Sequence, residues 1–128
     1  MRRARRSDFQ KRKRCLYALV FDDERAVYIG QSMNPKRRFS QHKAPSGGWF
    51  RAHRGMRMVI LEEIEGTYAQ AEVREYVWRW VAHIRRWTVY VLPPGKQARL
   101  GRRMGSFRRL EAWRTMLTKG WPVRQQFP

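Results

Sequence analysis

The sequence contains a single cysteine, Cys15, among 128 residues. One cysteine can form no disulfide within the chain and cannot build a cysteine zinc site. The three histidines (His42, His53 and His83) also lack the close pairing that is typical of a structural zinc site. This cysteine usage is typical of a reducing compartment, so we expect a cytoplasmic protein.

Long apolar runs are also missing. No stretch of about 18 apolar residues occurs, so we expect no transmembrane helix. The first residues, MRRARRSDFQKRKR, are as basic as the start of a signal peptide, but Asp22 and Asp23 interrupt the apolar segment that follows them. We therefore predict neither a membrane anchor nor a secretion signal.

Acidic residues are scarce. The chain has 10 Asp and Glu against 29 Lys and Arg, which gives a net charge of +19. Repulsion on this scale disfavours a compact monomer unless a polyanion neutralises it, so nucleic acid is the expected partner and a nucleoid-associated location is compatible with it. An acidic membrane surface is the alternative, but no basic segment shows one clean apolar face. The sequence identifies no protein partner.

The length and the apolar content of 42% predict one small α/β domain. A basic arm without fixed structure is expected over residues 1–14, the main folded domain over 15–87, and a basic helical extension over 88–128 that packs on the same domain. The expected core is a three-stranded antiparallel sheet flanked by helices. Its strands are predicted at residues 15–20, 26–29 and 56–61, and its helices at 35–43 and 67–85.

Fewer sequence signals indicate the secondary structure of the extension over residues 88–128. Residues 88–92 are either a short edge strand or an extended connection, and the following basic tract predicts a loop. A final helix is expected over residues 107–118, closed by Gly120. Its apolar face is predicted to consist of Phe107, Leu110, Trp113 and Leu117.

Five side chains together supply the chemistry that cutting a phosphodiester needs, and four of them lie on one predicted hairpin and the helix after it. Tyr17 and Tyr28 lie on neighbouring predicted strands, and Arg38 and His42 are four residues apart on one helix face. Glu75 lies on the later helix and offers a carboxylate to Mg²⁺, which keeps several waters and takes other ligands from a substrate phosphate. The guanidinium of Arg38 matches a phosphate geometrically.

These residues carry a resemblance. Leu16-Tyr17-Ala18 and Tyr28-Ile29-Gly30 resemble the two halves of the signature of the GIY-YIG nuclease superfamily, with the second half intact and the first keeping its tyrosine. Arg38, His42 and Glu75 fall where the family pattern has its arginine, histidine and metal-binding glutamate. The resemblance covers about residues 15–85. Family members often carry a later asparagine, whereas Asn34 is the only one here, so residues 88–128 depart from the pattern.

The resemblance implies a metal-dependent endonuclease that hydrolyses nucleic-acid phosphodiester bonds, with double-stranded DNA as the expected substrate. It implies that Tyr17 is the general base, that Tyr28 positions water or phosphate, that Arg38 contacts the scissile phosphate and that Glu75 holds Mg²⁺ (or Mn²⁺). His42 either accepts a proton from Tyr17 or contacts the phosphate. We expect the charge of Arg38 and the metal to favour the phenolate of Tyr17.

Alternative interpretations exist. The tyrosines alone are ordinary strand aromatics, and Glu75 can pair with Arg79 or share its role with Glu72, which is three residues earlier. A non-catalytic basic nucleic-acid-binding protein on a nuclease-like scaffold is the first alternative function. A basic membrane-surface or protein-assembly factor is the second.

Further nucleic-acid contacts are predicted around this site and in the basic tracts. Trp49, in a Gly-Gly loop, is the expected stacking residue, whereas Trp80 and Trp113 are expected to pack in the core. The predicted contact residues are Gly30, Lys36, Arg37, Trp49, Arg51, Lys96, Arg99, Arg102, Arg103 and Arg108.

Overall fold

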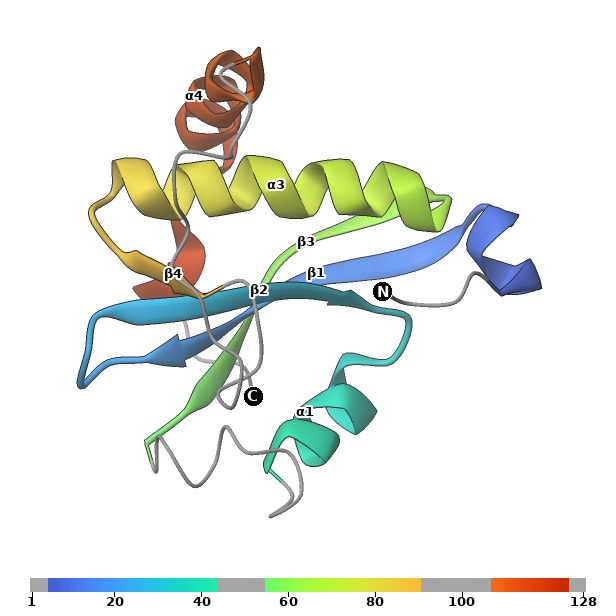
Figure 1. Ribbon diagram of the computed structural model, residues 1–128, viewed down its shortest axis with the longest axis horizontal. Coiled ribbons are helices and arrows are strands. Elements are labelled where there is room, and N and C mark those ends of the chain that lie inside the picture. The colour runs from blue at the N-terminus through green and yellow to red at the C-terminus, as the bar shows by residue number, and fades with distance from the viewer. Residues whose placement is uncertain (1–4, 44–54, 91–106, 125–128) are drawn as a thin grey trace.

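The computed structural model describes residues 5–43, 55–90 and 107–124. Its described part is an α/β domain built on one sheet with the strand order β3-β1-β2-β4 (Figure 1). The strands are β1 (Arg12–Phe21), β2 (Ala26–Ser32), β3 (Arg57–Gly66) and β4 (Thr88–Tyr90). The helices are α1 (Pro35–Lys43), α3 (Tyr68–Ile84) and α4 (Phe107–Lys119), with short 3₁₀ turns η1 (Arg6–Phe9) and η4 (Pro122–Arg124).

The sheet has a fourth strand beyond the three that the sequence predicts. β1 pairs antiparallel with both β2 and β3, as expected for a central strand. β4 pairs parallel with β2 from Ala26↔Thr88 to Tyr28↔Tyr90, so residues 88–90 form an edge strand and the sheet is mixed. Because β4 follows α3, the chain returns to the sheet through a helix, and such a crossover yields a parallel pair.

The two faces of the sheet have separate apolar clusters. Leu16, Ala18 and Val20 point to the face that α3 covers, together with Val77 and Trp78 of that helix. The alternate side chains of β1, such as Tyr17 and Leu19, point to the opposite face, on which α1 lies (Figure 1). The active-site tyrosine predicted from the sequence therefore faces α1.

The helix α3 begins as the sequence predicts. Thr67 caps it, accepting from the backbone N–H of Gln70 while the Gln70 side chain accepts from the Thr67 N–H. The spacing of Val73, Val77, Trp80 and Ile84 along this helix predicts an apolar core stripe, but Val73 is 40% exposed. Trp78 is fully buried instead, and its indole donates to Glu62.

The boundary of the N-terminal arm is also wrong. Residues 12–14 belong to β1, and η1 precedes them. Arg14 is buried, and its guanidinium donates to the carbonyl oxygens of Ser7 and Gly66, at 3.0 and 2.9 Å. These bonds satisfy a buried charged group and attach the N-terminal turn to the end of β3, which itself runs past the predicted stop at residue 62.

The helix α4 packs on α3 through a different face from the predicted one (Figure 1). Ala112 and Thr115 are buried, and Met116 packs beside them. Leu110, Trp113 and Leu117 are exposed by 69%, 45% and 81%. The small side chains let the two helices approach closely, and Thr115 accepts a hydrogen bond from Arg74 of α3. Within the described residues, no helix is long and apolar enough to cross a membrane.

Candidate active site

A cavity of about 320 Å³ lies where β2 ends, and side chains from both helical layers line it. The strands contribute Tyr17 and Tyr28, α1 contributes Arg38 and His42, and α3 contributes Glu75. The structure thus brings together all five side chains that the sequence spacing singles out.

The ring of Tyr17 occupies space that is free because its cross-strand neighbour has no side chain. Tyr17 pairs with Gly30, and a Cβ on Gly30 would lie 2.7 Å from the Tyr17 hydroxyl oxygen and 2.9 Å from Cζ. The register between β1 and β3 shifts between Leu16 and Tyr17. Such an irregularity bends the strand and changes the direction of a side chain, here next to the cavity.

The helix α1 supplies the two basic groups. Asn34 caps it, because its side-chain oxygen accepts from the backbone N–H of Arg37 at 3.1 Å. Pro35 at the first helical position has no N–H to satisfy. One turn apart on this helix, Arg38 and His42 both face the cavity.

The hydroxyl of Tyr17 and Nε2 of His42 lie 2.9 Å apart, within hydrogen-bond distance. Burial, reinforced by Arg38, lowers the pKa of His42 to about 4. The imidazole is therefore neutral near pH 7 and has one nitrogen free to accept a proton.

The tyrosines are protonated in the protein without metal. Burial raises the pKa of Tyr17 well above its usual value, and this effect outweighs the lowering by Arg38. Burial and the nearby Glu75 raise the pKa of Tyr28 as well. The expectation that Arg38 favours a phenolate at Tyr17 does not hold in this state, because the ring is 2% exposed and poorly solvated.

Glu75 reaches the cavity from the first half of α3. Its carboxylate accepts from Nε2 of Gln31 at 2.9 Å, and the same amide donates to the Tyr68 carbonyl oxygen at 3.3 Å. Burial raises the pKa of Glu75 to about 7, although Gln31 and Arg79 favour the charged form. Glu72, the competing carboxylate, is exposed and does not line the cavity.

Comparison with known protein families agrees with this geometry. Residues 13–81, more than half of the chain, match the family GIY-YIG, described as the GIY-YIG catalytic domain. The chain belongs to the GIY-YIG family. No curated protein and no solved structure matches the chain. A GIY-YIG domain implies a nuclease, with nucleic acid as its substrate, and nucleases of this family generally depend on a divalent metal.

The letters of the family name place its signature on this chain more closely. Tyrosine is the last letter of GIY, so the tripeptide that ends at Tyr17 is Cys15-Leu16-Tyr17 rather than Leu16-Tyr17-Ala18. Leu16 is fully buried against the α3 layer, a role that isoleucine also fills. Cys15 replaces the glycine at a half-buried position near Glu63, away from the residues that line the cavity. The first half of the signature thus departs at two positions: Leu16 keeps an apolar core residue, and Cys15 lies away from the cavity.

The GIY-YIG site fits a single hard cation. The described residues contain no cluster of three or more His, Cys, Asp or Glu side chains. One carboxylate, Glu75, suits Mg²⁺, which keeps most of its waters and takes further oxygen ligands from a phosphate. Beside it, Oε1 of Gln31 is buried and has no hydrogen-bond partner among the described residues, so this amide oxygen is a second hard donor.

Sequence reasoning missed several residues of the GIY-YIG cavity. Gln31 follows Gly30 directly, which was the only available signal, and Asp8 and Arg14 belong to the segment predicted to be an arm.

Lys36 and Arg37 are exposed on α1, and Arg108 lies in the first turn of α4. The remaining predicted nucleic-acid contacts lie outside the described residues: Trp49, Arg51, Lys96, Arg99, Arg102 and Arg103.

Proposed function

We propose that this GIY-YIG domain is an endonuclease that hydrolyses phosphodiester bonds of double-stranded DNA with the help of Mg²⁺ or Mn²⁺. One observation supports this most strongly: Tyr17, Tyr28, Arg38, His42 and Glu75 line a single cavity. Their chemistry covers what hydrolysis needs, namely a route for the proton of water, a cation for the phosphate and a metal ligand.

Tyr17 and His42 carry the proton. Attacking water gives its proton to the Tyr17 oxygen while the Tyr17 hydroxyl gives its own proton to Nε2 of His42, 2.9 Å away. Because its pKa is about 4, the imidazole of His42 is unprotonated near pH 7 and has a lone pair for that proton, although the lowered pKa makes it a weak base. This transfer lets a buried phenol act without becoming a stable phenolate.

Arg38 would bind the scissile phosphate directly, and Glu75 would act on it through a metal ion. Arg38 is exposed at the cavity rim, where its planar guanidinium is available to the scissile phosphate. Glu75, oriented by Gln31, would hold the metal ion. The ion supplies charge stabilisation for the phosphoryl and leaving oxygens. Tyr28, whose ring lies 6.0 Å from that of His42, positions the water or the phosphate.

Cleavage of supercoiled plasmid, with and without Mg²⁺, tests the proposal. We expect Glu75→Ala to abolish cleavage and Arg38→Ala to reduce it by about 10²–10³-fold, because each removes stabilisation of developing charge. Both variants should still bind DNA. Glu72→Ala is the matched control, since Glu72 is exposed on the same helix, and it should cut like the parent.

The alternative function makes the opposite prediction. If the parent shifts DNA but leaves it uncut with either ion, the domain is a non-catalytic binding protein. If Glu75→Ala cuts as well as the parent, the site assignment is wrong.

A further inference from the structure

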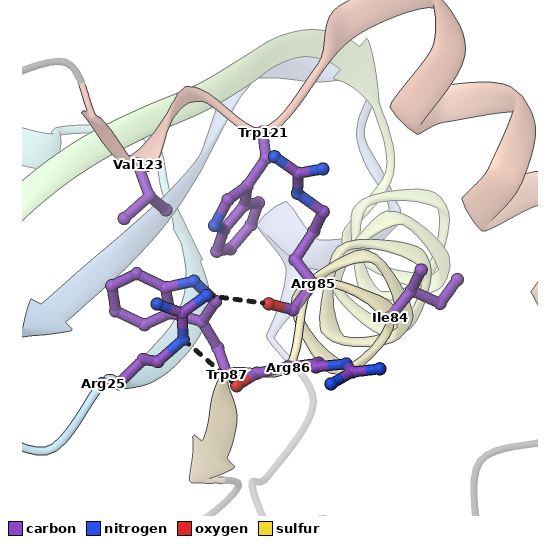
Figure 2. A pocket seen from close by; sticks show the side chains of 7 residues that line it. All are labelled: Arg25, Ile84, Arg85, Arg86, Trp87, Trp121 and Val123. Carbon is purple, nitrogen blue, oxygen red and sulfur yellow. Dashed lines mark hydrogen bonds between the residues drawn. The ribbon is translucent and has the colours of Figure 1, made fainter.

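Two cavities at the carboxyl end of α3 form one continuous surface outside the active site. The first, about 310 Å³ in volume, includes Arg25, Arg85 and Trp121 in its wall (Figure 2). The second, about 610 Å³, includes Trp80, Arg109 and Trp113. Both are lined by Ile84, Arg86 and Trp87, so they adjoin at these residues. We call this combined surface the Trp–Arg groove.

The backbone of the groove is fixed by Arg25. Its guanidinium donates to the carbonyl oxygens of Arg85 and Arg86, at 3.2 and 3.3 Å, and lies 5.1 Å from the ring centre of Trp87 (Figure 2). Arg25 and Arg86 both have positive φ angles, 49° and 65°. Such conformations persist where the surroundings hold them, and they are frequent at binding sites. Arg25 thus contacts the main chain of Arg85 and Arg86, whose side chains are exposed to solvent.

The charge of the groove is of one sign. Among the described residues that line it, none is acidic, and four are arginines. The segments outside the described ranges contain no Asp or Glu either, so they cannot add an acidic side chain to the groove. The groove is therefore suited to an anion.

Two indole N–H groups beside the groove have no hydrogen-bond acceptor among the described residues. Nε1 of Trp80 and Nε1 of Trp121 are buried and have no hydrogen-bond partner among the described residues. A buried N–H without an acceptor costs about 1–3 kcal/mol, and a ligand reduces that cost only where it brings an acceptor within hydrogen-bond reach. Trp113 also lies 45% exposed at the groove, where an aromatic ring in water offers a face for stacking.

We propose that the Trp–Arg groove binds an unpaired segment of nucleic acid, with a base stacked on the exposed indole of Trp113 and phosphates on Arg85, Arg86 and Arg109. A base inside a duplex is already stacked and cannot reach an indole, whereas an unpaired base can. The proposal rests on nucleic acid being the substrate of the domain, but it does not depend on the cleavage chemistry.

The spacing along α3 allows one substrate to contact the groove and the active site. Glu75 and Arg85 are ten residues apart, which corresponds to about 15 Å along a helix axis. That length is about four base steps of B-form DNA. The groove would then select substrates in which unpaired nucleotides lie close to the duplex that is cut.

Binding of fluorescein-labelled oligonucleotides in EDTA, followed by fluorescence anisotropy, tests the groove without cleavage. The probes are a single-stranded DNA, a single-stranded RNA of the same length and a DNA duplex. We expect Trp113→Ala to weaken single-strand binding by about tenfold, as for loss of one stacked base, and duplex binding by less than about twofold. Arg85→Gln and Arg109→Gln should each lower the salt dependence of single-strand binding, by about 0.7 in log–log slope.

Two control variants on α4 match these changes. Leu117→Ala removes an apolar side chain that is 81% exposed, and Arg114→Gln removes a charge, but neither residue lines the groove. Both should bind all three probes like the parent. Tighter binding of the DNA or of the RNA strand identifies the natural polymer and supports the groove in either case.

Equal single-strand affinity in the groove variants and the controls would overturn the proposal. So would an equal loss of duplex binding in Trp113→Ala, since that outcome indicates a duplex contact. Because these readouts require no cleavage, a domain that fails the plasmid assay can still pass this test, and the reverse also holds. Urea unfolding midpoints close to that of the parent establish that each variant is folded.

Discussion

At the scale of single residues, the contact between Gly30 and Tyr17 links the family signature to the chemistry. The glycine ends the tripeptide Tyr28-Ile29-Gly30, and the phenol ring of Tyr17 occupies the space where its side chain would be. The hydrogen bond from this ring to His42 depends on that position. Glycine is thus required at position 30 because the Tyr17 ring packs closely against it.

Gly30→Ala is therefore expected to move the Tyr17 ring and break its hydrogen bond to His42. We expect loss of plasmid cleavage and a decrease of about 1–3 kcal/mol in the free energy of unfolding, as in other overpacked sites. Gly55→Ala is the control, because its added Cβ would meet no atom within 4 Å. Urea unfolding and cleavage are measured for both. Full activity of Gly30→Ala would show that the Tyr17 position is not critical.

The burial of Glu75 lowers the free energy of unfolding as the pH rises toward neutral. Its pKa of about 7, against an ordinary value near 4.5, means that the folded state holds the proton more tightly than the unfolded state. The stabilising effect is complete below about pH 4.5 and is lost as the pH rises through 7. His42 acts in the opposite direction, since its lowered pKa makes stability rise with pH between about 4 and 6.5.

Glu75→Gln isolates the carboxylate contribution. In EDTA, the variant should become more stable than the parent as the pH rises from about 4.5 to 7, and the gain should reach about 3 kcal/mol above pH 7. His42 contributes equally to both proteins and cancels in the difference. Urea unfolding across this pH range measures it. A constant difference between the proteins at all pH values would exclude a raised Glu75 pKa.

At the scale of elements, one buried polar network ties β3, α3 and α4 together. The carboxylate of Glu62 on β3 is 6% exposed and accepts from Arg74 and Trp78 of α3. Arg74 also donates to Glu111 and Thr115 of α4. The network fixes the packing of the helical layer above the sheet and, with it, the path of α3 that carries Glu75.

Arg74→Met should cost about 1–3 kcal/mol in the free energy of unfolding, because the buried Glu62 then keeps only the Trp78 indole and Lys119, 3.7 Å away. The double variant Glu62→Met with Arg74→Met should recover much of that loss. Arg114→Met is the control, since its 3.3 Å pair with Glu111 is mostly exposed, and it should change stability by less than about 1 kcal/mol. A double variant no more stable than Arg74→Met would show that the charge is not the cause.

The elements also show what the sequence could and could not predict. The two helices that carry site residues were predicted closely, because their caps at Asn34 and Thr67 are local signals. The face of α4 was predicted wrongly, since the sequence favours the largest apolar residues whereas the helix packs through Ala112 and Thr115. The parallel pairing of β4 and the contact between Gln31 and Glu75 depend on long-range geometry, which spacing does not encode.

At the scale of the whole molecule, positive charge surrounds a small core. The net charge is +19, and the described basic side chains occur on every layer, including Lys36 on α1 and Arg85 after α3. Several of these side chains can contact phosphates at the same time. Each neutralised phosphate releases counterions, so the proposed function predicts an affinity for DNA that depends steeply on salt.

If six to ten phosphates are contacted, affinity should fall by about 10³–10⁵-fold between about 50 and 200 mM salt. Anisotropy of a labelled duplex, titrated in EDTA at several salt concentrations, measures this slope. Vesicles with anionic headgroups serve as the comparison, because a membrane-surface protein would bind them in preference to the duplex. Weak duplex binding with little salt dependence would contradict phosphate recognition. A steep slope that persists in Glu75→Ala would show that the charged surface captures DNA without the Glu75 carboxylate.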